Sequence, residues 1–457
     1  MRAFRLTLAA VPIVLLTLLP ARARGEDVKP SDLPRYKFPV GRKLTWAWSG
    51  ESKYSDGRAD SKSSSVTELT VVRANPDSSS RVLVRYIPTK NKDAKEGAED
   101  EGTFRYADVF PDGRFLPNDS FDVMSDISGT IPLLPADAGQ MSKGWRASRP
   151  ESQEERTYTP QPAKDSNEFV FTADVSGVLK TIYLVNRTYT FHLDRARGVI
   201  TADEDKFSQD HGFHVNGTSA SKLSTDETLS AADARALAAD LDLYIETRRD
   251  YGRKMGQLEK APADGADALD AAALDILKRG RAATKTEVVG GEFDRLLKHH
   301  AAYAKEARES ADEFKDILDK PSPDWATTDI DGKPVKLADF RGKVVVMDFW
   351  YRGCGFCMFA MPQVKQLAED YRDKPVVMLS MNTDLKDEDA RFVVEAFGLR
   401  HPTIKARGIN DKYGIHGFPT MVVIDPAGVV RDVHVGYSKT LRADVGKKID
   451  EALAKPQ

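Results

Sequence analysis

The chain has 457 residues, of which 67 are basic and 70 acidic, so its formal net charge at pH 7 is −3. This balance gives no indication of a nucleic-acid surface or a polybasic membrane patch. The hydrophobic fraction of 41% is ordinary for globular protein, and a chain of this length should divide into two or three domains. Cys354 and Cys357 are the only cysteines, so no structural disulfide is available elsewhere in the chain.

The first residues follow the pattern of an export signal. Arg2 and Arg5 precede an uncharged apolar stretch, 6–20, and Ala21-Arg22-Ala23 then fits a small-x-small cleavage site. The apolar stretch is shorter than the ~20 residues that a membrane helix needs. We therefore expect a signal peptide over 1–25, with an uncleaved leader that anchors the protein in the membrane as the alternative. No cysteine lies near the cleavage site, which excludes a lipid anchor on cysteine.

Residues 29–225 have the alternation of apolar and polar side chains that is typical of β strands. Leu44 and Trp46 begin one such run, and Asn75-Pro76-Asp77-Ser78 is a hairpin signal between two others. We expect an antiparallel β domain, an open or barrel-like meander whose role the sequence leaves unknown. The highly charged segment from Asp93 to Glu101 is expected to be a solvated loop.

The pattern changes to helix at Ser230, which can cap a helix that has Asp233 three positions later. Apolar residues then recur at steps of three and four along three segments. We expect 229–320 to be a helical connector or a small bundle. His299 and His300 lie in the third helix, where neighbours point to different faces, so we interpret them as solvated or packed side chains rather than metal ligands.

Pro321-Ser322-Pro323 indicates a linker, and 321–457 alternates strands with helices. The pattern predicts a first main strand from Val344 to Phe349, a helix from Met358 to Tyr371, and a closing hairpin. Such an order is typical of a mixed sheet covered by helices. The predicted fold class is therefore α+β and multidomain, with an N-terminal antiparallel β domain, a helical middle section and a C-terminal α/β domain.

The two cysteines lie where this last domain changes from strand to helix. The apolar run 344–350 leads into Cys354-Gly355-Phe356-Cys357, and helix-like sequence follows. A strand in this position delivers the cysteines to the surface, and the N-terminal dipole of the next helix stabilises the thiolate of the first one. The pattern indicates a thiol–disulfide redox site.

Residues 321–457 resemble the thioredoxin-fold domains of the exported TlpA/ResA-like redoxins. The segment 387–406 resembles the helix–strand insertion that this group adds to the minimal thioredoxin fold. The first two-thirds of the chain lie outside the resemblance. The matching motifs, in chain order, are Asp329-Ile330-Asp331-Gly332-Lys333, Phe340-Arg341-Gly342-Lys343, Asp348-Phe349-Trp350, Cys354-Gly355-Phe356-Cys357, Pro362, and Gly417-Phe418-Pro419-Thr420.

The resemblance implies a catalytic role for three residues. Cys354 would attack a substrate disulfide as the thiolate, and Cys357 would resolve the mixed disulfide. Asp348 would take the proton of Cys357 and return it, with its pKa raised by burial. The alternative for Asp348 is an acid at a surface or an edge. Pro419 matches the cis-proline that faces the cysteines and aligns a peptide substrate.

Three positions depart from the family's pattern. Gly353 replaces a tryptophan, Phe356 replaces a proline or histidine, and Phe418 replaces a smaller residue. Phe356 offers a thiolate no polar group, which argues against a strong oxidant, but it also lacks the rigidity of proline. We expect a reductase rather than an oxidant or isomerase. We assign Phe356, Phe418 and Pro419 to substrate binding, together with Trp350 as a wall beneath the site, although a plain core role for Trp350 fits equally well.

Two other functions stay open at this point. A peroxiredoxin-like thiol peroxidase shares the front hairpin, but its chemistry wants a threonine three residues before the cysteine, where Tyr351 stands. A partner-binding envelope protein would use the β domain for its main work and the redox domain as an accessory. A zinc site is disfavoured because a single Cys-x-x-Cys supplies two of four ligands, and we interpret His416 as a polar contact near the site.

The expected partners follow from the interpretation of the cysteine pair as a thiol–disulfide redox site. We expect protein thiols and disulfides as substrates, an upstream membrane thiol reductant, and no nucleic acid. We expect no cofactor and no metal. The predicted location is the bacterial periplasm or cell envelope.

Overall fold

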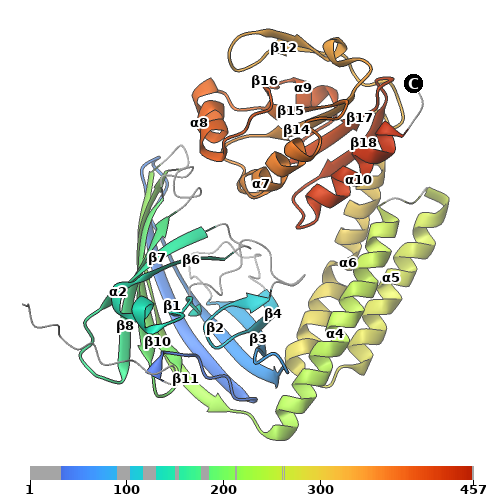
Figure 1. Ribbon diagram of the computed structural model, residues 1–457. Coiled ribbons are helices and arrows are strands. Elements are labelled where there is room, and N and C mark those ends of the chain that lie inside the picture. Colours follow the sequence, from blue (N-terminus) through green and yellow to red (C-terminus); the bar gives the residue numbers. More distant parts are fainter. Residues whose placement is uncertain are drawn as a thin grey trace, which may run out of the picture.

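The computed structural model describes residues 32–89, 103–116, 130–149, 154–176, 185–210, 214–259, 261 and 263–454. The expected signal peptide and the charged segment from Asp93 to Glu101 lie outside these ranges. Figure 1 shows a curved sheet, a group of long helices and a C-terminal domain. None of the helices in the described ranges is both long and apolar enough to cross a membrane.

The N-terminal part is one antiparallel sheet of eleven described strands, in the order β5-β4-β3-β2-β1-β11-β10-β9-β8-β7-β6. Strands pair with their sequence neighbours from β1 to β5 and from β6 to β11, as expected for a meander, and β1 also pairs with β11 along its whole length. A short helix, α2 (Ala138–Lys143), precedes β6. The strands are β1 (Arg42–Tyr54), β2 (Ser61–Ala74), β3 (Ser80–Pro88), β4 (Thr103–Val109), β5 (Phe115–Leu116), β6 (Trp145–Arg149), β7 (Glu154–Gln161), β8 (Glu168–Ser176), β9 (Asn186–Asp194), β10 (Val199–Asp210) and β11 (His214–Thr228).

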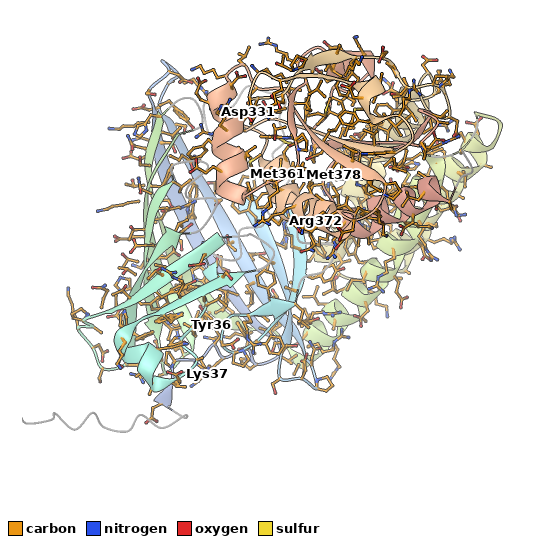
Figure 2. The ribbon with its side chains drawn as sticks, turned by 45° about the horizontal axis from the view of Figure 1, so that its top comes forward. Tyr36, Lys37, Asp331, Met361, Arg372 and Met378 are labelled. Carbon is orange, nitrogen blue, oxygen red and sulfur yellow. A yellow bond between two sulfur atoms is a disulfide. The ribbon has the colours of Figure 1, made fainter. Side chains whose placement is uncertain are left out.

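The sheet curls around an apolar core that is rich in aromatic side chains (Figure 1). Trp46 of β1 donates its indole N–H to the carbonyl of Ile200 across the core, at 2.8 Å. Tyr36, labelled in Figure 2, is buried in the same core and donates its hydroxyl to the carbonyl of Pro132 at 2.9 Å. The described edge strands β5 and β6 do not pair, so the described part of the sheet is curved but open.

Three helices pack together and cover the outer face of β2, β3 and β4. They are α4 (Ala231–Leu258), α5 (Ala263–Ala283) and α6 (Glu287–Glu313). Ser230 caps α4, because its hydroxyl accepts the backbone N–H of Asp233 at 3.1 Å. Leu83 and Tyr106 from the sheet share an apolar cluster with Leu241 and Phe293 from the helices. The bundle is therefore attached to the sheet by its own core.

His300 is buried inside this bundle. Its Nδ1 lies 3.1 Å from the hydroxyl of Tyr251, and its Nε2 lies 2.9 Å from a carboxylate oxygen of Asp270. These contacts join the three helices. No group of three or more His, Cys, Asp or Glu side chains in the described ranges is arranged to hold a metal ion.

The Pro-Ser-Pro linker is docked on the C-terminal domain rather than free. The backbone of Asp319 donates to the carbonyl of Val430 at 2.8 Å, and Val430 donates back to the carbonyl of Lys320 at 3.0 Å. Phe314 and Ile317, which follow α6 directly, pack against the core of the domain. The connection therefore behaves as an added edge segment beside the last strand of that domain.

The C-terminal domain is built on a five-stranded mixed sheet in the order β16-β15-β14-β17-β18. β14 pairs in parallel with β15 and antiparallel with β17, and a small hairpin of β12 and β13 turns at Gly332. This is the order of elements expected from the sequence. The strands are β12 (Ala326–Thr328), β13 (Pro334–Lys336), β14 (Val344–Trp350), β15 (Val376–Asn382), β16 (Thr403–Lys405), β17 (Thr420–Ile424) and β18 (Val430–Val435).

Helices cover both faces of this sheet. The face of Val344 and Val346 packs against α7 (Gly355–Asp370) and α10 (Leu441–Leu453), and α8 (Asp387–Phe397) lies beside α7. Figure 2 labels Met361 of α7 and Met378 of β15, both buried in this layer. The short helices Leu337–Phe340 and α9 (Ile409–Lys412) lie on the opposite face.

Candidate active site

The cysteine pair sits at the junction of β14 and α7. All seven residues of β14 are buried, so this strand is fixed at the centre of the sheet. It ends at Trp350, and a turn follows in which the backbone of Cys354 donates to the carbonyl of Tyr351 at 3.1 Å. Cys354 is then the N-cap of α7. The helix begins at Gly355, three residues before the predicted start.

The two cysteines differ in their access to solvent. They form a disulfide with the Cα atoms 5.2 Å apart. Cys354 is 6% exposed, whereas Cys357 is fully buried. The backbone N–H of Cys357 donates to the Sγ of Cys354 at 3.1 Å, so the outer sulfur receives a helix N-terminal hydrogen bond. A disulfide partner from another molecule can therefore reach Cys354 before it reaches Cys357.

Asp348 is buried on the same face of β14 as the cysteine layer. Only 1% of its surface is exposed, and neither carboxylate oxygen has a hydrogen-bond partner among the described residues. Burial raises the pKa of Asp348 to about 7, since an unpaired carboxylate is poorly stabilised away from water. A carboxyl group with such a pKa can both accept and return a proton near neutral pH.

Trp350 is fully buried in one apolar cluster with both cysteines, Met358 and Met361. Its indole N–H donates to the hydroxyl of Ser380 at 2.6 Å. The side chain therefore lies beneath the disulfide and has no exposed surface for a substrate. Its burial fits the core role considered for it, whereas the assignment of Trp350 to substrate binding stays a prediction.

The segment Gly417-Phe418-Pro419 forms the other side of the site. The peptide bond between Phe418 and Pro419 is cis, as the resemblance implies. Pro419 is buried, and its carbonyl accepts the backbone N–H of Gly436 at 2.8 Å. Phe418 is partly buried and packs against the cluster that holds the cysteines. The side chain of His416, by contrast, is exposed.

Exposed aromatic side chains stand near Cys354 in the sequence. Phe356 is 47% exposed and Tyr351 38% exposed. The ring of Tyr351 meets that of Phe418 edge to face, with centroids 5.4 Å apart. A Cβ atom on Gly353 would lie 3.1 Å from the Tyr351 ring, so this ring fills space beside the glycine. In the sequence, Tyr351 counts only as evidence against a peroxidase. The signal that could have assigned it to the site is its position as an aromatic residue three positions before Cys354.

The insertion helix α8 is tied to the active-site turn through Arg352. The backbone N–H of Arg352 donates to Asp384 at 2.9 Å, and its guanidinium donates to Asp389 at 2.8 Å. The same guanidinium lies over the ring of Phe392, 4.4 Å from the centroid. Burial raises the pKa of Asp384 above its usual range. These contacts hold the turn before Cys354 from the side of the insertion, and the sequence alone did not reveal them.

Comparison with known proteins agrees with this arrangement. The family model described as Redoxin matches residues 312–449. The thiol-disulfide oxidoreductase ResA of Bacillus anthracis is 32% identical over 128 residues, which cover 28% of this chain and 74% of the relative. The thioredoxin-like protein YneN of Bacillus subtilis (strain 168) is 33% identical over 118 residues, covering 25% of this chain and 69% of that protein.

A solved structure is similar as well. The crystal structure of a thiol:disulfide interchange protein of the thioredoxin family from Chlorobium tepidum is 23% identical, covers 30% of this chain and 99% of its own, and has a TM-score of 0.28. The segment matched by the Redoxin model contains Asp348, both cysteines and Pro419. Through this C-terminal segment the chain belongs to the ResA-like redoxins, and it is a thioredoxin-like thiol-disulfide oxidoreductase.

Proposed function

We propose that this protein is exported and reduces disulfide bonds of other proteins with the Cys354–Cys357 dithiol. The observation that carries the proposal is the position of the Cys354 sulfur, which is the N-cap of α7 and the more exposed of the two. A helix N-terminus stabilises a thiolate, which is the attacking form of the group. The full burial of Cys357 suits a thiol that acts second.

The proposed reaction has two steps. The Cys354 thiolate attacks one sulfur of the substrate disulfide, so that a Cys354–substrate bond forms and the substrate's own S–S bond breaks. Cys357 then loses its proton and attacks the Cys354 sulfur, which forms the Cys354–Cys357 bond and releases the second substrate sulfur. Two electrons pass to the substrate, whose two thiolates take up protons, and the enzyme is left oxidised.

Asp348 is proposed as the group that accepts the Cys357 proton. Its pKa of about 7 and its burial on the cysteine side of β14 support this role. After an upstream thiol reductant has reopened the disulfide, the same carboxyl returns the proton. We propose a membrane protein as that reductant, since an exported dithiol has no access to cytoplasmic reductants.

Phe418 and Pro419 are proposed to align the substrate chain beside Cys354, with Phe356 as an apolar contact. The exposure of Phe356 and the contact between Tyr351 and Phe418 support an apolar rim around the reactive sulfur. Trp350 supports the site from below. We propose reduction as the direction because Phe356 offers no polar group that would favour the thiolate as strongly as a histidine does.

We propose that the chain divides into four parts. They are a signal peptide over 1–25, the β domain over 29–225, the helical section over 229–320 and the redox domain over 321–457. The bacterial periplasm or cell envelope is the proposed location. We propose that the β domain binds a partner, since a partner bound there would be held on the same chain as the redox domain.

Insulin reduction by dithiothreitol tests the activity. Wild type should accelerate precipitation of the insulin chains, and Cys354→Ser should not. Equal rates for the two proteins would refute the redox function. Cys357→Ala should retain substrates as mixed disulfides on Cys354, which identifies them by mass spectrometry. A reduction potential near −150 mV would contradict the reductase direction, because it lies close to that of a strong oxidant.

A further inference from the structure

A row of buried polar side chains crosses the redox sheet at the level of Asp348. Asp348 of β14 pairs with Ser380 of β15, and Ser380 pairs with Thr403 of β16. Paired residues of neighbouring strands project from the same face, so the three side chains lie side by side beneath α7 and α8. Their exposed fractions are 1%, 0% and 4%. Most other residues on this face are aliphatic or methionine, which makes the row distinct.

The polar atoms of this row are poorly satisfied by the protein. Both carboxylate oxygens of Asp348 and the hydroxyl of Thr403 have no partner among the described residues. The Ser380 hydroxyl accepts the indole N–H of Trp350, which leaves its own hydrogen for a neighbour. Buried polar groups without partners destabilise a fold, so the two on β14 and β16, on either side of Ser380, need an explanation.

A nearby residue shows that this pattern is specific to the row. Asn382 follows Ser380 on the same face of β15 and is also buried. Its side chain donates to Asp384 at 2.7 Å and accepts the backbone N–H of Asp384 at 3.1 Å. Both the amide N–H and the carbonyl oxygen of the Asn382 side chain thus have a partner, whereas the polar atoms of Asp348 and Thr403 have none among the described residues.

His401 is a partly exposed residue close in the chain to the end of this row. It precedes Thr403 by two residues, and the backbone of Ser380 donates to the carbonyl of Pro402 between them at 2.9 Å. The His401 side chain is partly exposed, but its Nε2 is buried without a partner among the described residues. Burial lowers the pKa of His401 to about 4, so at pH 7 the neutral ring keeps one nitrogen that accepts and one that donates.

We propose that Ser380, Thr403 and His401, bridged by ordered water, carry the proton between Asp348 and solvent. The inference rests on the proposed function, in which Asp348 takes a proton from Cys357 in each turnover. Both groups are buried, so this proton needs a path out. Neighbouring strands lie about 4.8 Å apart, a span that one water with polar partners on each side bridges. A proton leaves Asp348 along this row after the mixed disulfide is resolved, another enters by the same row before Cys357 is reprotonated, and no electron moves in either step.

The test is repeated turnover of the full-length protein on a disulfide peptide at pH 7, with dithiothreitol as the reductant. Thr403→Val removes the hydroxyl at constant shape and should slow turnover by about tenfold or more, less than the 10²–10⁴-fold range for loss of an acid–base group itself. Thr403→Ser keeps the hydroxyl and should retain the wild-type rate. The reduction potential of all three proteins should be the same, because a relay changes the rate and not the equilibrium.

Two further variants make the result decisive. Thr286→Val is the matched control, since the Thr286 hydroxyl in the helical section is also buried without a partner among the described residues, and its rate should equal that of wild type. His401→Ala should be slow and should recover on addition of imidazole. A wild-type rate in Thr403→Val, or equal slowing in Thr403→Ser, would overturn the relay. If wild type itself fails to reduce the peptide, the proposed function fails instead.

Discussion

The backbone N–H of Cys357 donates to the Sγ of Cys354, which makes the outer sulfur the cap of its own helix. In the reduced protein this N–H, together with the helix dipole, stabilises the Cys354 thiolate. Phe356 lies between the two cysteines and adds no polar group. The potential of the pair therefore depends on the helix terminus and on whatever occupies position 356.

Phe356→His should raise the reduction potential. An imidazole beside the thiolate stabilises the reduced form, and we expect an increase of about 30–60 mV, equivalent to ~1.4–2.8 kcal/mol for two electrons. The measurement is equilibration with glutathione redox buffers. Phe356→Leu is the control and should change the potential little. An equal shift in both variants would mean that the aromatic ring itself sets the potential.

Asp348→Asn should make the oxidised redox domain more stable at high pH. The unfolded chain loses the Asp348 proton near pH 4, whereas the folded protein keeps it until about pH 7. The folded state thus binds more protons in this window, so its stability is intact below pH 4 and falls as the pH rises to 7. The difference between wild type and variant should approach about 4 kcal/mol at pH 8 and vanish at pH 4.

Hydrogen exchange of β14 amides measures this difference within the redox domain, without requiring the whole chain to unfold in one step. A constant difference between pH 4 and pH 8 would contradict the raised pKa.

Gly217→Val should destabilise the β domain while leaving disulfide reduction intact. A Cβ atom at Gly217 would lie 2.6 Å from the carbonyl oxygen of Glu51 and 2.4 Å from the ring of Phe207. The ring has room to rotate but the backbone does not, so we expect a loss of about 1–3 kcal/mol. Gly252→Ala in α4 is the control, since nothing lies within 4 Å of its added Cβ. Thermal unfolding and the insulin assay separate the two effects.

Arg431→Gln should loosen the docked linker. Arg431 bonds both Asp319 and Asp425 at 2.7 Å, and it is the side chain that joins the linker to the domain by charge. Limited proteolysis between 319 and 324 should become faster in this variant, because cleavage follows local opening. Lys320→Gln is the control, since among the described residues the Lys320 side chain makes an exposed ion pair with Asp316 and no ion pair with the domain. Equal cleavage rates would show that backbone pairing alone holds the segment.

The redox domain could be predicted in detail because its motifs are local. The start of α7 was placed three residues late, since its cap is the sulfur of Cys354 and not one of the usual oxygen-bearing caps. In the β domain, β11 is mostly polar, and its long pairing with β1 depends on contacts far apart in the sequence. The row from Asp348 to Thr403 depends on the register of three strands from separate segments, which no local pattern contains.

The docked linker also affects what the redox site can reach. Glu313 ends α6, and the next residue, Phe314, already packs on the redox core, so the joint has almost no free chain. A flexible tether that matched the span would give Cys354 an effective concentration on the order of millimolar toward a ligand held elsewhere on the chain. With this short joint, that concentration is high for ligands on a narrow arc and close to zero for all others. The orientation of one joint thus selects which bound disulfides the enzyme meets.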